Sequence, residues 1–473
     1  MHYCKEWCYS EFQMKFLKLT SINVRLLTYF IGLAVVGVIL FRLPVFYVGE
    51  PVPFVDSLFT TVSAICVTGL ASVDMSVYST WGLVLLLFLI EAGGLGFVSF
   101  LVLYAALPSK KMSLVNRRIV KDFFIDEVEV NPRLIVRRIV GYTLVFELIG
   151  GFVLAFLLQH RWTATGEGVA SLGMNLFYGM FLAVSAFCNA GFAPYSNNLQ
   201  GFVHEPLFIA VILVLIVCGG LGFTVFTNLL DWLSYKTSRG KRSRVLLTLH
   251  TRIVLLATVF LIVSGAVVFF AAEAKSSLAG LSWGERIMNA LFQSVTLRTA
   301  GFETVAQREF SVVSELISVV YMFIGGSPGS IAGGVKTTTV FVLLCVAFRS
   351  SQDKGNLSLW RRDISQETVE KASVIVMRSL LFVFIVVLLL LIAEADAIDS
   401  GVFDGGDLIF EAVSAFCTVG LTRGVTMELS GIGKVLIIIT MFIGRTGVAA
   451  MILSYKKNLD SITAYPEANI LVG

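Results

Sequence analysis

Charged residues are scarce in this sequence. Asp, Glu, Lys and Arg make up 14% of its 473 residues, whereas they make up about a quarter of a typical soluble domain. Apolar runs of roughly 20 residues, the length that crosses a bilayer as a helix, recur along the whole chain. The composition therefore excludes a soluble globular protein and predicts an all-α membrane protein.

Motifs of metal and nucleotide chemistry are also missing. The four histidines form no HExxH-type pattern, and the seven cysteines have neither disulfide nor zinc spacing. A Rossmann fingerprint is absent, and the segment from Gly329 to Lys336 comes nearest to a Walker loop but has the wrong spacing. Catalysis would need clustered His, Cys or carboxylate side chains, whereas Glu91, Glu147 and Arg445 are scattered along the chain. We therefore expect no enzyme activity, no transition metal and no cofactor in this chain.

The long apolar segments come in pairs, and each pair encloses a shorter, glycine-rich stretch. Eight spans, which place both termini on the same side of the membrane, are expected at residues 24–43, 79–106, 134–158, 206–233, 250–272, 311–348, 374–393 and 432–455. Lys and Arg are concentrated around the connections 108–133, 234–249 and 349–373, which are therefore cytoplasmic together with both termini. These basic loops are orientation signals and candidate docking surfaces rather than nucleic-acid sites. Segment 394–411 has six carboxylates and no Lys or Arg, so it predicts an acidic outer vestibule that concentrates cations.

A short motif recurs once in each pair of spans. Its copies lie within residues 56–70, 183–192, 289–302 and 407–421, and each contains one glycine near its end: Gly69, Gly191, Gly301 and Gly420. Four copies at nearly constant spacing indicate internal repetition rather than ordinary GxxxG helix-packing motifs. The chain then divides into four repeats, at residues 1–107, 108–233, 234–348 and 349–473.

The motif has the dimensions of a loop that enters the membrane and returns. The stretch of about 12 residues before each glycine is too short to span the bilayer as a helix. Glycine lets the backbone turn its carbonyl groups inward, and four such loops around one axis make a ring of oxygens that can replace the hydration shell of a cation. The negative C-terminal ends of the short helices also favour a cation, and Asp56 and Asp407 are expected to be N-caps of two of them. The predicted architecture is eight transmembrane helices, arranged as four helix–pore-loop–helix repeats around a pseudo-fourfold central pore.

The second helix of the third repeat is interrupted. The other three repeats have matching glycine-containing centres at 91–97, 218–223 and 443–448, whereas Ile324–Thr339 has five glycines and a proline within eleven residues. Such a segment cannot continue a helix, and at mid-membrane depth it must line an aqueous path. We predict an intramembrane gate below the filter, formed by Gly325, Gly326, Ser327, Pro328, Gly329, Ser330, Gly333, Gly334, Lys336 and Arg445.

Two charges lie near this segment. Arg445 is mid-span in the fourth repeat, where a charge is costly and usually faces a cavity or a partner. We expect its guanidinium to donate hydrogen bonds to the loop and to oppose ions in the closed state. The alternative is a pairing of Arg445 with Glu91 or with a helix carbonyl. Lys336 either belongs to the gate or extends to the cytosolic face.

The fourfold pattern resembles the superfamily of Trk, Ktr and HKT potassium transporters over essentially the whole chain. The ending at residues 465–473 and the lack of additional spans look most like the membrane subunits of Ktr systems (KtrB type). The resemblance implies channel-like potassium uptake across the bacterial cytoplasmic membrane, with Na⁺ as a candidate activator. It further implies a homodimer with one pore per subunit, seated on a cytosolic ring of nucleotide-binding, KtrA-like regulatory subunits.

The same resemblance assigns the oxygens that would bind K⁺ in the filter. Position by position, they belong to Val67, Thr68, Gly69, Asn189, Ala190, Gly191, Thr299, Ala300, Gly301, Thr418, Val419 and Gly420. Only the glycine is common to all four repeats and no second glycine follows it. We therefore expect fewer ordered ion sites and looser discrimination between K⁺ and Na⁺ than in a tetrameric potassium channel.

The third repeat departs from the others. It is one residue shorter before its glycine, and Arg298 takes the place that Cys66, Cys188 and Cys417 have in the other repeats. We expect Arg298 to anchor its pore loop, because a cation in the ion path would repel potassium, and the cysteines to pack behind the filter.

Two alternatives to a gated channel-like transporter remain from the sequence. One is a sodium- or proton-coupled potassium symporter, or a sodium-permeable relative. The other is a solute transporter with broken helices at its midplane, which four repeats disfavour because that class usually has two.

Overall fold

The computed structural model describes residues 22–106, 132–166, 168, 171–237, 246–348, 357–360 and 362–453. Most of the basic connections, the N-terminal segment and the chain ending used above lie outside these residues. The longer helices are α2 (Ile22–Leu40), α4 (Thr80–Ala106), α6 (Pro132–Thr165), α10 (Leu249–Glu273), α14 (Gln366–Ala393) and α17 (Gly431–Leu453). The shorter ones are α3 (Phe54–Cys66), α7 (Leu172–Phe187), α8 (Pro206–Leu221), α9 (Phe223–Thr237), α11 (Trp283–Thr296), α12 (Val312–Phe323), α13 (Thr337–Ala347), α15 (Ala395–Asp399) and α16 (Gly405–Phe416).

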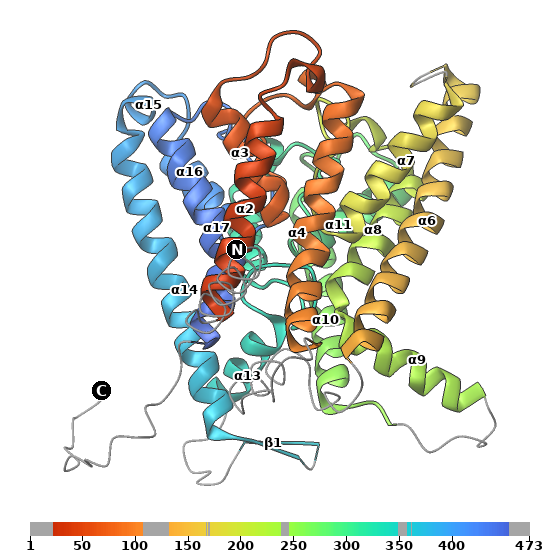
Figure 1. Cartoon of the computed structure of the whole chain (residues 1–473), viewed down its shortest axis with the longest axis vertical. Helices are drawn as coiled ribbons and strands as arrows, with labels where there is room; N and C mark the ends of the chain where they lie inside the picture. Colours follow the sequence, from red (N-terminus) through yellow and green to blue (C-terminus); the bar gives the residue numbers. More distant parts are fainter. Residues whose placement is uncertain are drawn as a thin grey trace, which may run out of the picture.

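Small elements complete the described chain. Four 3₁₀ turns lie at Pro44–Phe46, Met75–Val77, Gln200–Phe202 and Gln307–Glu309. Strands β1 (Leu357–Leu359) and β2 (Arg362–Ile364) form one antiparallel hairpin, in which Leu357 pairs with Ile364. This hairpin lies at the lower end of the molecule in Figure 1, below α14.

Most of the predicted spans correspond to helices within a few residues. By length and composition, three helices of the described chain can each cross a membrane: Arg137–Thr165, Leu249–Glu273 and Gln366–Ala393. The predicted break in the third repeat is confirmed, because α12 ends at Phe323 and α13 begins at Thr337. The predicted span 206–233 is wrong as one helix, because α8 and α9 meet at an angle of 99° around Gly222. The count of eight spans stays a prediction.

The helix packing follows a cyclic order. The second helix of each repeat contacts the short helix of the next repeat: α4 contacts α7, α8 contacts α11, α12 contacts α16, and α17 contacts α3. In Figure 1 the short helices α3, α7 and α16 lie in the upper half of the molecule, among the longer helices. The last helix of the described residues, α17, therefore packs on α3, the short helix of the first repeat, and this contact closes the cycle.

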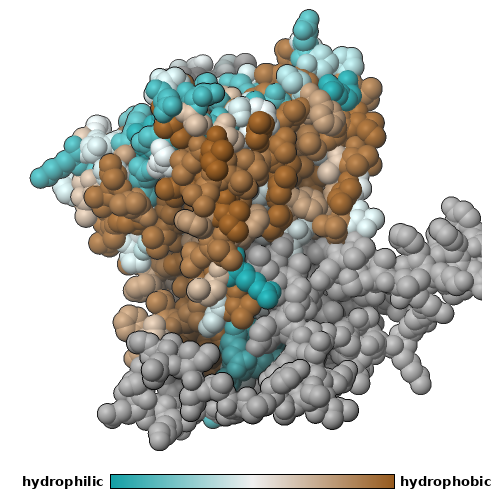
Figure 2. All heavy atoms as spheres, turned by 90° about the vertical axis from the view of Figure 1, so that its left-hand side faces the viewer, coloured by the Kyte–Doolittle hydropathy of each residue, from teal (hydrophilic) through white to brown (hydrophobic). Residues whose placement is uncertain are grey.

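The molecule has an apolar exterior and a partly polar interior. A broad apolar band covers the face shown in Figure 2, with hydrophilic residues gathered above it. Large apolar side chains such as Phe156, Val267 and Phe384 are 60% or more exposed, while Ser63 and Thr61 of α3 are fully buried. Lipid can cover the exposed apolar side chains, but it offers no hydrogen-bond partner to polar side chains, which are buried instead. This distribution suits a protein that is surrounded by a bilayer.

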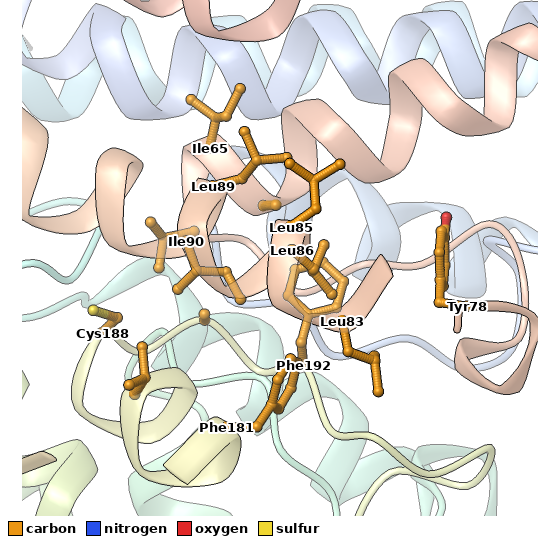
Figure 3. Packing of buried hydrophobic residues seen from close by; sticks show 14 of the residues in the cluster. Ile65, Tyr78, Leu83, Leu85, Leu86, Leu89, Ile90, Phe181, Cys188 and Phe192 are labelled. Carbon is orange, nitrogen blue, oxygen red and sulfur yellow. The ribbon is translucent and has the colours of Figure 1, made fainter. Parts of the chain in front are cut away.

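Apolar contacts join the first two repeats. Leu86 and Leu89 of α4 are buried beside Ile65 of α3 and beside Phe181 and Phe192 of the second repeat, as Figure 3 shows. Close packing of this kind leaves little room for the short helices to shift.

Several helices have a polar residue at the N-cap position. Thr248, Ser311 and Ser365 accept from N–H groups in the first turns of α10, α12 and α14. The N-caps of α3 and α16 are Pro53 and Asp404, so the prediction that Asp56 and Asp407 are N-caps is wrong by three residues. Both carboxylates lie in the first turn instead, where they still face the positive end of the helix dipole.

These two carboxylates also make ion pairs. Asp56 pairs with Lys434 of α17 at 2.8 Å, and Asp407 pairs with Arg423 at 2.5 Å. The first pair joins α3 of the first repeat to α17 of the fourth repeat.

Candidate functional site

The four short helices α3, α7, α11 and α16 each lead into a loop with the same unusual backbone. The residue two positions before each glycine is left-handed, with φ of 56° at Val67, 56° at Asn189, 67° at Thr299 and 51° at Thr418. The glycines themselves have φ of 99°, 71°, 76° and 92° in chain order. A left-handed Val or Thr is rare and costs about 1–3 kcal/mol, so surrounding structure must impose it.

The four glycines lie around one centre. A side-chain Cβ on Gly69 would lie 2.5 Å from the carbonyl oxygen of Ala190, and one on Gly191 would lie 2.8 Å from that of Ala300. A Cβ on Gly301 would overlap the Val419 carbonyl oxygen, and one on Gly420 would overlap that of Thr68. Each loop thus touches the next, and the fourth touches the first. Only glycine fits at these four positions, because any side chain would meet neighbouring backbone.

Backbone hydrogen bonds hold the loops. In three repeats the residue before the glycine donates its N–H to a serine carbonyl five positions earlier: Thr68 to Ser63 at 2.8 Å, Ala190 to Ser185 at 2.7 Å, and Val419 to Ser414 at 2.8 Å. In the third repeat Ala300 donates to Thr296, four positions earlier, at 2.9 Å. The one-residue difference predicted from the sequence therefore corresponds to a tighter turn.

The cysteines and Arg298 lie behind the loops. Cys66, Cys188 and Cys417 are buried and free. Arg298 is also buried, and its Nη2 donates to the Thr258 hydroxyl on α10 at 3.3 Å. This contact ties the third loop to the preceding long helix, as the anchoring prediction requires.

The glycine-rich centres of the second helices allow a close approach to the ends of the short helices. A Cβ at any of three of these glycines would overlap the carbonyl oxygen of a residue near the end of a short helix: Gly93 with Ile65, Gly219 with Phe187, and Gly444 with Phe416. The second helices of these repeats therefore pack backbone to backbone against the C-terminal ends of the short helices. In the third repeat Gly325 meets the Gly333 carbonyl in the same way, so the interrupted segment packs against itself.

The interrupted segment of the third repeat folds back under the glycine ring. Gly325 donates its N–H to the Val335 carbonyl at 2.9 Å, which closes the segment into a loop. A Cβ on Gly333 would lie 2.7 Å from the Cys417 carbonyl oxygen and would overlap the Thr418 hydroxyl. The predicted gate segment, from here on the gate loop (residues 324–336), therefore contacts the glycine-containing loop of the fourth repeat.

The bend between α8 and α9 holds the opposite side of the gate loop. The Ser327 N–H donates to the Gly220 carbonyl at 3.1 Å, and its hydroxyl donates to the Leu221 carbonyl. Phe223 in turn donates its N–H to the Gly329 carbonyl at 3.2 Å. The broken span of the second repeat, which the sequence analysis missed, thus supplies backbone partners for the gate loop.

Arg445 contacts the gate loop directly. Its guanidinium donates to the Ile331 carbonyl of the loop and, at 3.2 Å, to the Gly93 carbonyl of α4. The expected bond to the loop and the alternative bond to a helix carbonyl are therefore both present. Lys336 turns back and donates to the Ala332 carbonyl at 2.5 Å, within the same loop.

One cluster contradicts the sequence analysis. Glu91 and Glu147, which were expected to lie apart, have ligand atoms within 4.8 Å of each other and of the Cys188 thiol. The thiol donates to Glu91 Oε2 at 3.2 Å. Three ligands are fewer than a structural zinc site uses, so we assign no metal. The sequence places Cys188 directly before Asn189 of the second glycine-containing loop. No sequence pattern indicated that α4, which carries Glu91, approaches α6, which carries Glu147.

The predicted acidic vestibule is mostly used for structure. Glu394 accepts from the Ser430 N–H and hydroxyl, at 3.1 and 2.6 Å. Glu411 is fully buried and accepts from Thr422 at 2.8 Å. At the mouth of the ring, burial raises the pKa of Glu303 to about 7 against the opposing effect of the Gln200 amide. Glu303 is therefore a better candidate for an electrostatic group near the pore than most of segment 394–411.

Loops that enter an apolar belt from short helices and meet around one centre define a class, the membrane transport proteins for cations. The chain belongs to the TrkH family of cation transport proteins, and the family model matches residues 35–464. Within the Trk, Ktr and HKT group it is of the KtrB type. The family is one of cation transporters and not of enzymes.

Individual relatives agree with this membership. The chain is 34% identical to the Ktr system potassium uptake protein B of Vibrio alginolyticus, over 94% of this chain and 93% of the relative. It is 33% identical to the potassium/sodium uptake protein NtpJ of Enterococcus hirae, over 90% and 91%. The crystal structure of the potassium transporter TrkH from Vibrio parahaemolyticus has the same fold, with a TM-score of 0.69, 16% identity and coverage of 93% and 86%.

Proposed function

We propose that the chain takes up potassium through the glycine ring, which acts as a selectivity filter. The observation that supports this most directly is that the four glycine-containing loops contact one another in a closed cycle, at Gly69, Gly191, Gly301 and Gly420. Backbone carbonyls from four loops can replace the water around a bare cation without a charged side chain. The names of two relatives, a potassium uptake protein and a potassium/sodium uptake protein, agree with this substrate class.

The filter oxygens in this proposal come from the three residues that end at each glycine. These residues combine a left-handed first position with a left-handed glycine, which suits carbonyl groups that share one direction. The C-terminal ends of α3, α7, α11 and α16 precede them, and their partial negative charge favours a cation. Since the side chains differ among the four repeats, we expect fewer ordered sites than in a symmetric channel.

The gate loop closes the path below the filter in this proposal. Its contacts with Thr418, with the α8–α9 bend and with Arg445 support this assignment, because they connect the gate loop to both the second and the fourth repeat. The buried guanidinium would also repel cations while it stays in place. Opening would require these few hydrogen bonds to exchange for water.

Sodium permeation is the second candidate. The relative from Enterococcus hirae is named for both ions, and a filter with one common glycine per repeat holds its oxygens less uniformly than a repeated longer motif. Coupling to Na⁺ or H⁺ remains part of this alternative.

Membership in the same family also supports a proposal for the partners and the location of the chain. We propose a homodimer in the bacterial cytoplasmic membrane, with both termini in the cytoplasm. A nucleotide-binding, KtrA-like ring would act on the gate from the cytosolic side, where β1 and β2 are predicted to lie. Na⁺ would act as an activator rather than as a bound cofactor.

Growth of a potassium-uptake-deficient bacterium on limiting potassium tests the function. Expression of the chain should restore growth, and Gly301→Ser should abolish the rescue, because its Cβ would overlap the Val419 carbonyl. Gly280→Ser is the matched control, since a Cβ at Gly280 meets nothing within 4 Å. Rescue that is indifferent to Gly301→Ser, with both variants in the membrane at wild-type amounts, would argue against this filter.

A further inference from the structure

Asn198 joins the loops that follow two of the four glycines. Its backbone is left-handed, with a φ of 50°, a conformation that Asn adopts more readily than most residues. The side-chain amide nitrogen donates to the Gly191 carbonyl at 3.1 Å and to the Gly301 carbonyl at 3.4 Å. The side-chain oxygen accepts from the Glu303 N–H at 3.3 Å. A single side chain thus connects the second and third quadrants of the ring, which are the parts that the second and third repeats contribute.

The two loops are also connected without Asn198. The Leu199 N–H donates to the Glu303 carbonyl at 3.1 Å, and the Gln200 side chain donates to the Glu303 carboxylate at 2.9 Å. These bonds do not involve filter carbonyls. The contribution of Asn198 to the glycine carbonyls can therefore be separated from its contribution to loop packing.

The other two quadrants are held differently. Among the described residues, we find no side-chain donor to the carbonyl oxygens of Gly69 and Gly420. In these repeats the hydroxyls of Ser63 and Ser414 instead accept the glycine N–H groups, each at 3.1 Å. The ring is consequently asymmetric. Asn198 binds the carbonyl groups of Gly191 and Gly301, whereas at Gly69 and Gly420 a serine hydroxyl binds the N–H group instead.

We propose that Asn198 is a positioning residue that sets the discrimination between K⁺ and Na⁺. This rests on the proposed function, in which glycine carbonyls replace the water around the ion. A carbonyl oxygen that accepts an amide N–H keeps one lone pair for the ion and loses freedom to turn inward. The second and third quadrants then keep the wider spacing that suits K⁺ and cannot contract around the smaller Na⁺.

The test compares permeability in liposomes that contain the purified, reconstituted chain. Asn198→Asp keeps the size and the oxygen that accepts from Glu303 but loses both donors to the filter carbonyls. Reversal potentials under opposed K⁺ and Na⁺ gradients should show a K⁺/Na⁺ permeability ratio about fivefold lower, the factor that one net hydrogen bond corresponds to. The added carboxylate also strengthens the local negative field, which itself favours the smaller Na⁺, so a neutral variant must separate the filter geometry from the charge.

Two further variants make the result decisive. Asn198→Gly removes the side chain without adding a charge and without straining the left-handed backbone, so it should lower the ratio in the same direction. Gln200→Leu breaks the neighbouring bond to Glu303 and should leave the ratio unchanged. A K⁺/Na⁺ ratio that stays at the wild-type value in both Asn198 variants, with unaltered unfolding temperature, would overturn the inference.

The inference and the proposed function fail in different ways. If the wild-type chain passes no monovalent cation in liposomes, the proposed function is wrong. If the wild-type chain conducts and Gly301→Ser abolishes conduction while both Asn198 variants keep the ratio, only the role of Asn198 is wrong. If Gln200→Leu lowers the ratio as much as Asn198→Asp, general loop packing sets the selectivity and the positioning role is excluded.

Discussion

At the scale of single residues, the site depends on backbone groups more than on side chains. The strained positions Val67, Thr299 and Thr418 turn the backbone of the loops. The hydroxyls of the short helices that support these loops bind backbone atoms, at Ser63, Ser185, Thr296 and Ser414. Arg445 is a further example, because both of its hydrogen bonds given above end on main-chain carbonyls. Such a site is hard to infer from residue types, since its chemistry is that of the peptide group.

Arg445→Ala should increase cation flux. The substitution removes a charge-assisted hydrogen bond from the Ile331 carbonyl, worth about 1.5–3 kcal/mol, so the closed state should lose population by about tenfold. Uptake of Rb⁺ into reconstituted liposomes measures the change. Arg445→Lys separates two causes: low flux would indicate that the charge itself blocks ions, and high flux that the two-carbonyl geometry holds the loop. Flux equal to the wild type in Arg445→Ala, at normal expression, would remove this role.

Glu303 should make the flux depend on pH. Burial raises the pKa of this carboxyl from its usual 4.5 to about 7, so it is largely neutral at pH 6 and ionised at pH 8. An anion at the mouth of the ring attracts cations, and we expect Rb⁺ uptake to rise across this interval. Glu303→Gln should flatten the profile. An equally steep profile in the variant would assign the pH dependence to another group.

The same shift has a consequence for stability. Between about pH 4.5 and 7 the folded chain binds more protons at Glu303 than the unfolded chain does, so the contribution of this group to stability is complete below pH 4.5 and is lost as the pH rises through 7. The difference in unfolding temperature between the wild type and Glu303→Gln should therefore decrease as the pH rises from about 4.5 to 7. A difference that stays constant with pH would contradict the raised pKa of Glu303.

At the scale of helices and loops, two neighbouring breaks support one another. The broken span of the third repeat was predicted from its five glycines and one proline. The bend at Gly222 was not predictable in this way, because residues 219–223 match residues 93–97, where α4 continues unbroken. Gly222 has a φ of 86°, and a Cβ there would lie 2.7 Å from the Ser327 hydroxyl and 2.9 Å from the Pro328 carbonyl oxygen. The bend makes room for the gate loop, so it is a tertiary feature rather than a local one.

Gly222→Ala should destabilise the gate loop. A left-handed alanine and its contacts with Ser327 and Pro328 together cost on the order of 1–3 kcal/mol. The unfolding temperature in detergent should fall by a few degrees. The Rb⁺ flux should change because the gate loop loses its contacts with the α8–α9 bend. Gly280→Ala, at a position with open space, is the control for a general effect of added methyl groups. Equal unfolding temperatures for the two variants would show that the bend tolerates a side chain.

At the scale of the whole molecule, the cyclic order of contacts is the main result. The chain closes because α17 packs on α3, and Lys434 pairs with Asp56 across this junction. A single chain can therefore enclose a central ring, without subunits arranged around it. Any second copy would add a second ring rather than complete the first.

A dimer with two independent pores is the corresponding prediction. The chain purified in mild detergent should have the mass of two copies by light scattering. Mixed dimers of wild-type and Gly301→Ser chains should retain about half the Rb⁺ flux of the wild-type dimer, because one ring remains intact. Complete loss of flux in mixed dimers would indicate that the copies share one path.

Much of the architecture could be predicted because lipid imposes simple rules on sequence. Apolar length and basic loops predicted most long helices, and the recurrent Gly69, Gly191, Gly301 and Gly420 predicted the short helices between them. The interrupted third repeat was also predictable, since its glycines and Pro328 cannot continue a helix. Helix starts were predicted less well: Asp56 and Asp407 lie in first turns because the caps, Pro53 and Asp404, depend on the incoming loop.

The sequence by itself determined which segments prefer lipid, where helices must stop, and which four positions accept only glycine. These properties follow from local chemistry: apolar surface, missing N–H groups and the absence of a Cβ. Only the tertiary structure decided that Glu91 and Glu147 meet at Cys188, that the chain bends at Gly222 between α8 and α9, and that Asn198 binds the carbonyls of Gly191 and Gly301. These contacts join segments from different helices and repeats, and their geometry depends on how the helices pack rather than on the residues adjacent in the chain.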